Sequence, residues 1–149
     1  MYKHIIVAID GTELTPKVIE HALTIAGEAA AKVEVVTVTE PSVLVAPGAE
    51  LITISTRELL EELEKAKAAE ARVILAGVQD AVKASGVSAD YRHVRQQIPS
   101  DGIIQVAEEL GADLIVMGSH GRRGIKRLLL GSQASDVLAR SKVPVLIVK

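Results

Sequence analysis

The chain has 149 residues, a formal net charge of −2 and no cysteine, so it fits a single domain and forms neither disulfides nor thiolate metal sites. The lack of a basic excess, and of Trp and Phe, argues against nucleic-acid binding through phosphates or base stacking. No apolar run approaches the roughly 20 residues that span a bilayer, and the first residues lack a signal-peptide layout. We therefore expect a cytoplasmic protein that binds neither nucleic acid nor membrane.

The first half of the chain alternates strand patterns with helical ones. The apolar run 4–9 predicts a buried strand, and Thr15-Pro16 predicts a helix start with Thr15 as its cap. A second strand is expected at 33–38. A long helical pattern then covers about 53–85, and Gly77 is the point where it could bend.

The second half continues the alternation. A strand of mixed polarity is expected at 89–94, and a helix opens at Pro99 and ends at Gly111. The remaining predicted elements are a strand at 113–117, a helix at 132–140 and a strand at 144–148. This order predicts one α/β domain over 1–149, an open parallel five-stranded sheet with helices on both faces. The pattern alone does not fix the strand order, because a flavodoxin-like order would place the ligand crevice elsewhere.

The glycine-rich stretch from Gly118 to Gly131 is the most informative segment. It follows the carboxyl end of a buried strand, where open α/β sheets bind ligands. Its glycines permit positive φ and a close approach of backbone to ligand, so that N–H groups can form an anion nest. Gly131-Ser132 stands at a predicted helix start, which favours phosphate, and Ser119 adds a hydroxyl donor. The segment therefore predicts a phosphate-binding loop.

This loop has neither of the commoner nucleotide signatures. The Walker pattern is absent, and the turn after the first strand offers Asp10-Gly11-Thr12 without the further glycines of a dinucleotide site. The spacing Gly118-x2-Gly121-x9-Gly131-Ser132 instead resembles the motif of ATP-binding universal stress proteins. The segments 2–12 and 143–148 are similar to the first and last strands of that family, so the resemblance covers essentially the whole chain.

The resemblance implies a Rossmann-like fold of the adenine nucleotide α-hydrolase type, with strand order 3-2-1-4-5. Asp10 and Gly118 would then flank one crevice at the switch point of the sheet. It implies ATP at this crevice, with Ala8 and Asp10 at the nucleoside and the backbone of Val38 at adenine. The residues implied for the nucleotide's other contacts are Met117, Gly118, Ser119, His120, Gly121, Arg122, Arg123, Gly124, Gly131, Ser132 and Gln133. A cation, Mg²⁺ or Mn²⁺, would bridge the phosphates, with Asp10 as the candidate protein ligand.

Two residues depart from the family pattern. Thr37 stands where the second strand usually carries a histidine, and Ala134 stands where another hydroxyl is common. The first departure concerns the adenine side and the second a phosphate contact.

Several of these residues have a structural alternative. Asp10 could simply bond its own backbone in a turn, and His120 could brace the loop instead of donating to a phosphate. The basic cluster that includes Arg122 and Arg123 is either a phosphate clamp or a solvated face. We expect Leu128-Leu129-Leu130 to form a short helix packed on the core.

Three functions fit the sequence. The first is an ATP-binding regulatory or stress-response module that acts on a protein partner. The second is a slow ATPase or phosphoryl-transfer enzyme, which the lack of an evident water-positioning residue disfavours. The third is an interaction protein that binds no nucleotide. An apolar edge strand is a pairing liability, and the resemblance implies that Val143–Val148 pairs with its copy in a homodimer.

Overall fold

The computed structural model describes residues 1–43, 56–121 and 129–149. Its centre is one parallel sheet in which the five strands stand in the order β3-β2-β1-β4-β5. This is the order implied by the resemblance, and it excludes the flavodoxin-like alternative. The strands are β1 (His4–Ala8), β2 (Lys32–Thr39), β3 (Ala89–Arg95), β4 (Leu114–Gly118) and β5 (Val145–Val148). The helices are α1 (Thr15–Ala29), α2 (Thr56–Ala76), α3 (Gln79–Ser85), α4 (Pro99–Glu109) and α5 (Ser132–Arg140).

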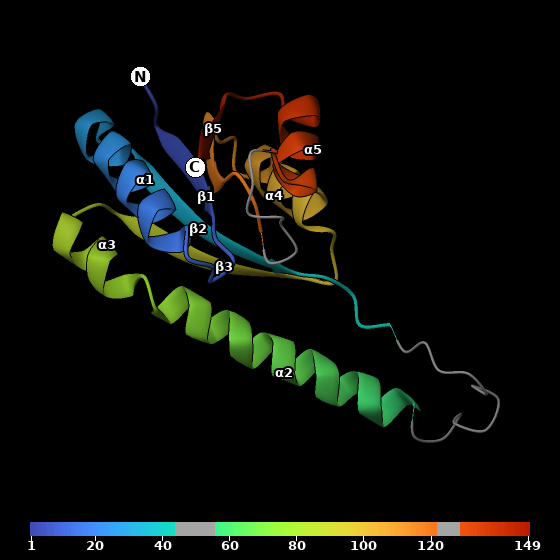
Figure 1. Cartoon of the computed structure of the whole chain (residues 1–149). Coiled ribbons are helices and arrows are strands. Elements are labelled where there is room, and N and C mark those ends of the chain that lie inside the picture. The colour runs from blue at the N-terminus through green and yellow to red at the C-terminus, as the bar shows by residue number, and fades with distance from the viewer. Residues whose placement is uncertain (44–55, 122–128) are drawn as a thin grey trace.

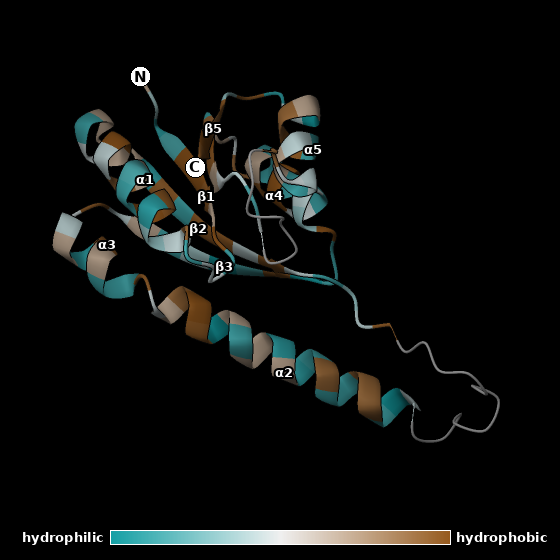
Figure 2. Ribbon diagram, in the orientation of Figure 1, coloured by the Kyte–Doolittle hydropathy of each residue, from teal (hydrophilic) through white to brown (hydrophobic). Residues whose placement is uncertain are grey.

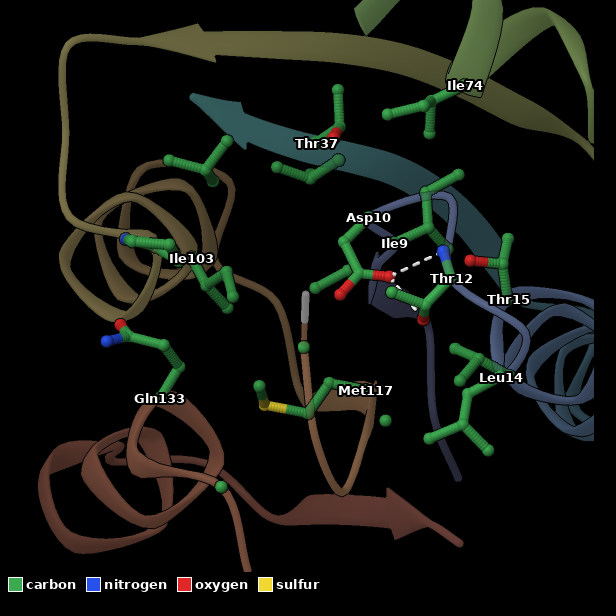
Figure 3. A pocket seen from close by; sticks show the side chains of 18 of the residues that line it. Ile9, Asp10, Thr12, Leu14, Thr15, Thr37, Ile74, Ile103, Met117 and Gln133 are labelled. Carbon is green, nitrogen blue, oxygen red and sulfur yellow. Dashed lines mark hydrogen bonds between the residues drawn. The ribbon is translucent and has the colours of Figure 1, made fainter. Parts of the chain in front are cut away.

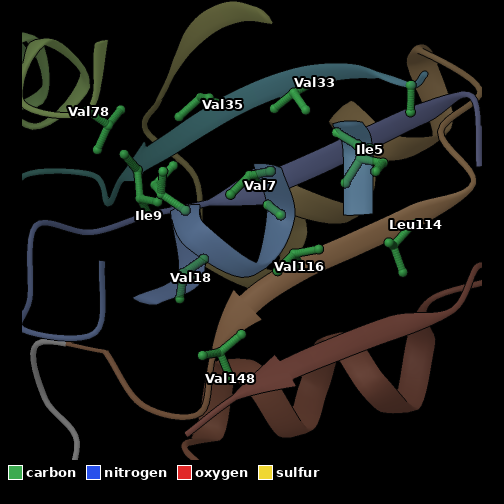
Figure 4. Packing of buried hydrophobic residues seen from close by; sticks show 14 of the residues in the cluster. Ile5, Val7, Ile9, Val18, Val33, Val35, Val78, Leu114, Val116 and Val148 are labelled. Atoms are coloured by element: carbon green, nitrogen blue, oxygen red, sulfur yellow. The ribbon is translucent and has the colours of Figure 1, made fainter. Parts of the chain in front are cut away.

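The helices form two layers, one on each face of the sheet (Figure 1). Alternate strand residues, among them Val7, Val35 and Val116, pack with Val18 of α1 and with Leu75 and Val78 from the α2–α3 region. Figure 4 shows this cluster gathered between α1 and the strands. The remaining strand positions pack with α4 and α5 in a second cluster that contains Ile6, Val36, Ile103, Ile115 and Val137. Because side chains alternate along a strand, each strand of the core serves both layers.

Hydropathy follows these layers, with brown apolar residues on the strands and mixed bands on the outer helices (Figure 2). Among the described residues, no helix is both long and apolar enough to cross a bilayer. The edge strand β3 is the most polar of the sheet, as expected. The buried carboxylate of Glu34 on β2 accepts a 3.0 Å hydrogen bond from Arg92 of β3, and this pair ties the edge to the centre.

Three expectations about local structure are wrong. The long helical pattern is two helices and not one, although the interruption falls at Gly77, the expected bend point, and at Val78. Thr15 does not cap α1, since the cap position is Leu14 and no side-chain cap hydrogen bond forms. Of the three leucines, Leu128 lies outside the described residues, whereas Leu129 and Leu130 are exposed and not helical.

The strands end at different heights along the sheet, and this creates the crevice. β1 ends at Ala8, which is level with Val36, whereas β2 continues to Thr39. Ile9 N–H donates to the carbonyl of Val36, so the Val36 carbonyl faces the β1 side. Backbone groups two residues apart on a strand point the same way. The N–H and C=O of Val38 therefore point toward the β1 side of β2, but β1 has ended at Ala8 and does not pair with them.

Candidate functional site

A cleft of about 450 Å³ opens at the carboxyl ends of the strands, where β1 and β4 diverge (Figure 3). Ten of the implied nucleotide contacts line it: Ala8, Asp10, Val38, Met117, Gly118, His120, Gly121, Gly131, Ser132 and Gln133. Ser119 lies in the same loop but is not among the lining residues. Arg122, Arg123 and Gly124 lie outside the described residues. The binding of phosphate by the two arginines therefore stays a prediction.

The cleft also has a wall that the sequence reasoning missed. Lys67, Glu70, Ala71 and Ile74 of α2 line it from the side opposite α4. Lys67 Nζ donates a 2.5 Å hydrogen bond to the carbonyl of Glu40, just beyond β2. The sequence gives little indication of this wall, because the spacing of these four residues is equally typical of a helix face that packs on the core.

Asp10 takes the turn-forming role that we considered as the alternative. Its Oδ1 accepts hydrogen bonds from the backbone N–H of Thr12, at 3.0 Å, and from the Thr12 hydroxyl, at 2.7 Å. The other carboxylate oxygen faces Gly121, where an added Cβ would lie 3.2 Å from Asp10 Oδ2. One carboxylate thus fixes the β1–α1 turn and also reaches the glycine loop across the crevice.

The loop glycines are needed for close approach. None of Gly118, Gly121 and Gly131 has a positive φ, so that part of the sequence argument is wrong for these three. A Cβ on Gly131 would lie 2.9 Å from the carbonyl of Ser119, whose oxygen accepts a 2.6 Å hydrogen bond from Gly131 N–H. That contact closes the base of the loop and excludes any larger residue without a backbone shift.

His120 braces the loop within the described part of the chain. Its Nε2 lies 3.1 Å from the carboxylate of Glu13, and its Nδ1 lies 3.4 Å from the Ser119 hydroxyl. The imidazole therefore connects the loop after β4 with the turn after β1, on either side of the crevice mouth.

The first turn of α5 forms the floor of the cleft beside the loop. The first N–H groups of a helix have no partner within it and favour an anion. Gln133 uses its side-chain oxygen to accept a 2.9 Å hydrogen bond from Ser100 N–H at the start of α4, so α4 engages the acceptor end of this side chain, while its amide N–H groups remain possible donors to a ligand. Ala134, the second departure, is buried here and offers no hydroxyl.

The charged groups of the described lining are mainly acidic. Asp10, Glu40 and Glu70 contribute carboxylates, whereas Lys67 contributes one ammonium group and His120 an imidazole. Within the described ranges, no three His, Cys, Asp or Glu side chains gather closely enough to hold a metal ion. An anion in this cleft therefore needs a cation of its own or the arginines of the loop.

Comparison with known proteins agrees with this geometry. The family model described as the universal stress protein family matches residues 1–149. The chain is 36% identical to universal stress protein MJ0531 of Methanocaldococcus jannaschii, over all of this chain and 83% of that protein. The chain thus belongs to the universal stress protein family.

Two solved structures extend the comparison. Universal stress protein UspA from Lactobacillus plantarum superimposes with a TM-score of 0.83 and 25% identity, over 99% of this chain and 98% of that one. A universal stress protein crystallised in complex with cAMP has a TM-score of 0.68 and 30% identity, over 99% of this chain and 96% of that chain.

Proposed function

We propose that this protein is an ATP-binding regulatory module that holds a nucleotide in the cleft between β1 and β4. The observation that carries the proposal is the convergence of the glycine loop, the first turn of α5 and the backbone of Val38 on one cleft. The bound cAMP of one solved relative supports an adenine nucleotide as the ligand class. A cytoplasmic location suits a protein that uses ATP.

The polarity of the cleft orients the nucleotide. The outward-facing N–H and C=O of Val38 offer a donor and an acceptor side by side, which match the ring nitrogen and amino group of adenine. The N-terminus of α5 and the loop between Gly118 and Gly131 suit the phosphates. Because the described charges of the cleft are mainly carboxylates, we propose that ATP enters with Mg²⁺ or Mn²⁺, held by the phosphates, by water and by Asp10.

Binding without efficient turnover is the better-supported mode. Phosphoryl transfer requires a group that positions the attacking water or hydroxyl. The imidazole of His120 is held between Ser119 and Glu13 and acts as a brace. We propose that occupancy of the site changes the affinity for a regulatory protein partner, and that a homodimer forms through β5.

The test is calorimetric titration of Mg²⁺-ATP into nucleotide-stripped protein, compared with the Gly121→Val variant. We expect saturable binding near one ATP per chain in the parent, and its loss in the variant, because the valine branches would enter the space between the loop and Asp10. Gly27→Val is the matched control, since a Cβ at Gly27 on α1 meets nothing within 4 Å.

Titrations of AMP and cAMP, together with phosphate release from ATP, define the ligand preference and the turnover. Absence of binding by the folded parent would contradict the proposal and favour an interaction protein. Sustained phosphate release that depends on Gly121 would favour the enzyme.

A further inference from the structure

A hydrogen-bond network behind the cleft joins α5 to the start of α4. Ser100, which is 1% exposed, donates its N–H to Gln133 Oε1 at 2.9 Å and its hydroxyl to Asp136 Oδ2 at 2.6 Å. Arg140, one turn further along α5, contacts Asp136 at 3.1 Å and Asp101 of α4 at 2.5 Å. The three α5 residues are spaced three and four apart, so they lie on one face of the helix.

For α4, this network replaces a missing cap. The cap residue Ile98 has an apolar side chain, and no side-chain cap hydrogen bond forms there. The N–H of Ser100 is one of the first N–H groups of α4, which have no partner within the helix. Gln133 supplies that partner from α5, and the carboxylate of Asp136 lies at the N-terminus of α4, where a negative charge is favourable. The start of α4 therefore depends on side chains of α5.

The first turn of α5 is fixed at two points. The N–H of Gly131 donates a 2.6 Å hydrogen bond to the carbonyl of Ser119 at the base of the loop, and Gln133 is held by Ser100. Ser132, between these two points, lines the cleft together with its neighbours. The first N–H groups of a helix point away from its C-terminus and carry its positive end, so those of α5 are directed toward the cleft.

Apolar packing does not fix this orientation by itself. Ala134 and Val137 of α5 share a buried cluster with Ile103 of α4, which keeps the two helices together. Hydrophobic burial is not directional, whereas hydrogen bonds restrict both distance and angle. A binding group is effective only when it is held within about 0.5 Å of its productive position. The network therefore decides where the first turn of α5 stands, and packing decides that α5 stays on the sheet.

We propose that Ser100 and Asp136 are positioning residues for the phosphate end of the cleft. Neither is among the described residues that line the cleft, so they act on a ligand only through α5. They hold its first turn where the N–H groups meet an anion. This inference rests on the proposed nucleotide function and adds to it a control of affinity from behind α5. Because the proposed adenine contact is the backbone of Val38 on β2, the network affects only the affinity that the phosphates contribute.

The experiment measures the Mg²⁺-ATP affinity by calorimetry, and the adenosine affinity by displacement of ATP, for the parent and three variants. Ser100→Ala and Asp136→Leu each remove the bond between the two side chains. We expect ATP to bind these variants about tenfold more weakly, the equivalent of about one hydrogen bond to a charged group, and adenosine to stay within about twofold of the parent. Asp136→Asn keeps an oxygen acceptor for the Ser100 hydroxyl, so it is expected to bind ATP as the parent does.

Two further variants sharpen the comparison. The double variant Ser100→Ala with Asp136→Leu is expected to bind ATP no more weakly than either single variant, since both changes remove the same bond. Glu108→Gln is the matched control. It breaks the 2.9 Å ion pair with Lys142, which also joins α4 to the chain that follows α5 but does not line the cleft. Its ratio of ATP to adenosine affinity should equal that of the parent.

This ratio separates positioning from a general structural role. A lowered melting temperature with the parental ratio in Ser100→Ala and Asp136→Leu would overturn the inference, as would equal losses of affinity for the two ligands. If the parent binds ATP and Gly121→Val does not, while both variants keep the parental ratio, only the positioning role is wrong. If the folded parent binds neither ligand, the proposed function is wrong and this inference with it.

Discussion

The carboxylate of Asp10 has two contacts, one with the β1–α1 turn and one with the glycine loop, and a single substitution can separate their effects. It holds the β1–α1 turn through Oδ1 and reaches Gly121 with Oδ2. The sequence places this residue between a buried strand and a glycine, and the family resemblance implied its role at the ligand. It could not decide between a turn and a ligand contact, because an aspartate in that place satisfies both requirements with the same atoms.

Asp10→Asn is expected to keep the turn and lose the metal-dependent part of ATP binding. The amide oxygen can still accept from Thr12, but its neutral group is a poor ligand for Mg²⁺. We expect ATP affinity to fall about tenfold with Mg²⁺ and to change little without it. Titrations with Mg²⁺ and with EDTA measure this difference.

Asp10→Ala serves as the comparison. It removes both hydrogen bonds to Thr12, so the free energy of unfolding should fall by about 1–2 kcal/mol in urea. If Asp10→Asn binds ATP as the parent does in both media, Asp10 is not a metal ligand.

At the scale of elements, the sequence predicted the strands and the last helix closely and failed where tertiary contacts decide. The run 144–148 and the start at Ser132 agree with β5 and α5 to within one residue. Gly77 marked the place of a possible bend, but the apolar stripe continues through it, so the sequence did not show that α2 and α3 are separate helices. The α2 wall of the cleft was missed because its contact is distant in sequence: Lys67 bonds the carbonyl of Glu40, just beyond β2.

The β2–β3 pairing depends on a buried ion pair. Glu34 is buried, and Arg92 Nε approaches its carboxylate to 3.0 Å, with a second contact from Arg92 to Glu109 of α4. Arg92→Met would leave a buried charge unpaired, so we expect a loss of about 2–4 kcal/mol in urea unfolding. The double variant Glu34→Leu with Arg92→Met should recover most of that loss. If Arg92→Met alone is as stable as the parent, water reaches the carboxylate of Glu34 and the ion pair is not needed.

His93 on β3 predicts a dependence of stability on pH. Burial lowers its pKa, and the nearby Arg95 lowers it further, against an opposing contribution from Glu64. Its folded pKa therefore lies below the unfolded value of about 6.5. The unfolded chain binds more protons between the two values, so the stability contribution falls as pH drops below about 6.5 and levels off below the folded pKa.

Urea unfolding of the parent and of His93→Gln at pH 7.5 and 5.5 checks this sign. The variant should lose less stability on acidification than the parent. Equal losses in the two proteins would assign the pH dependence to other groups.

For the whole molecule, the two edge strands of the sheet are β3 and β5, neither of which pairs with a further strand among the described residues, and they differ in polarity. β3 carries the charged side chains Asp90, Arg92 and Arg95, which discourage pairing with another chain. β5 is short and apolar. The backbones of Pro144 and Val148 bond β4, so by alternation the N–H groups of Val145 and Ile147 face outward.

We predict that Val145→Pro converts the proposed homodimer into a monomer. Proline is tolerated at the first residue of a strand, and here it removes an outward N–H without touching the β4 ladder. Sedimentation should report about twice the 15.8 kDa chain mass for the parent and the chain mass for the variant. Ala89→Pro, at the first residue of the other edge, should leave the assembly unchanged. A parent that sediments as a monomer at micromolar concentration would refute the dimer.

Hydrogen bonds join α5 to α4 along their length, beginning with the bond between Gln133 and Ser100. Ser100 donates a further bond to Asp136, and Arg140 at the far end of α5 contacts Asp101. This set of contacts begins in the first turn of α5, which lines the cleft, and only four residues separate α5 from β5. A small displacement of the first turn of α5 at the cleft would therefore move the whole helix and reach the edge strand β5. If the proposed nucleotide and the proposed dimer both exist, the two sites are coupled through α5 without direct contact between ligand and partner.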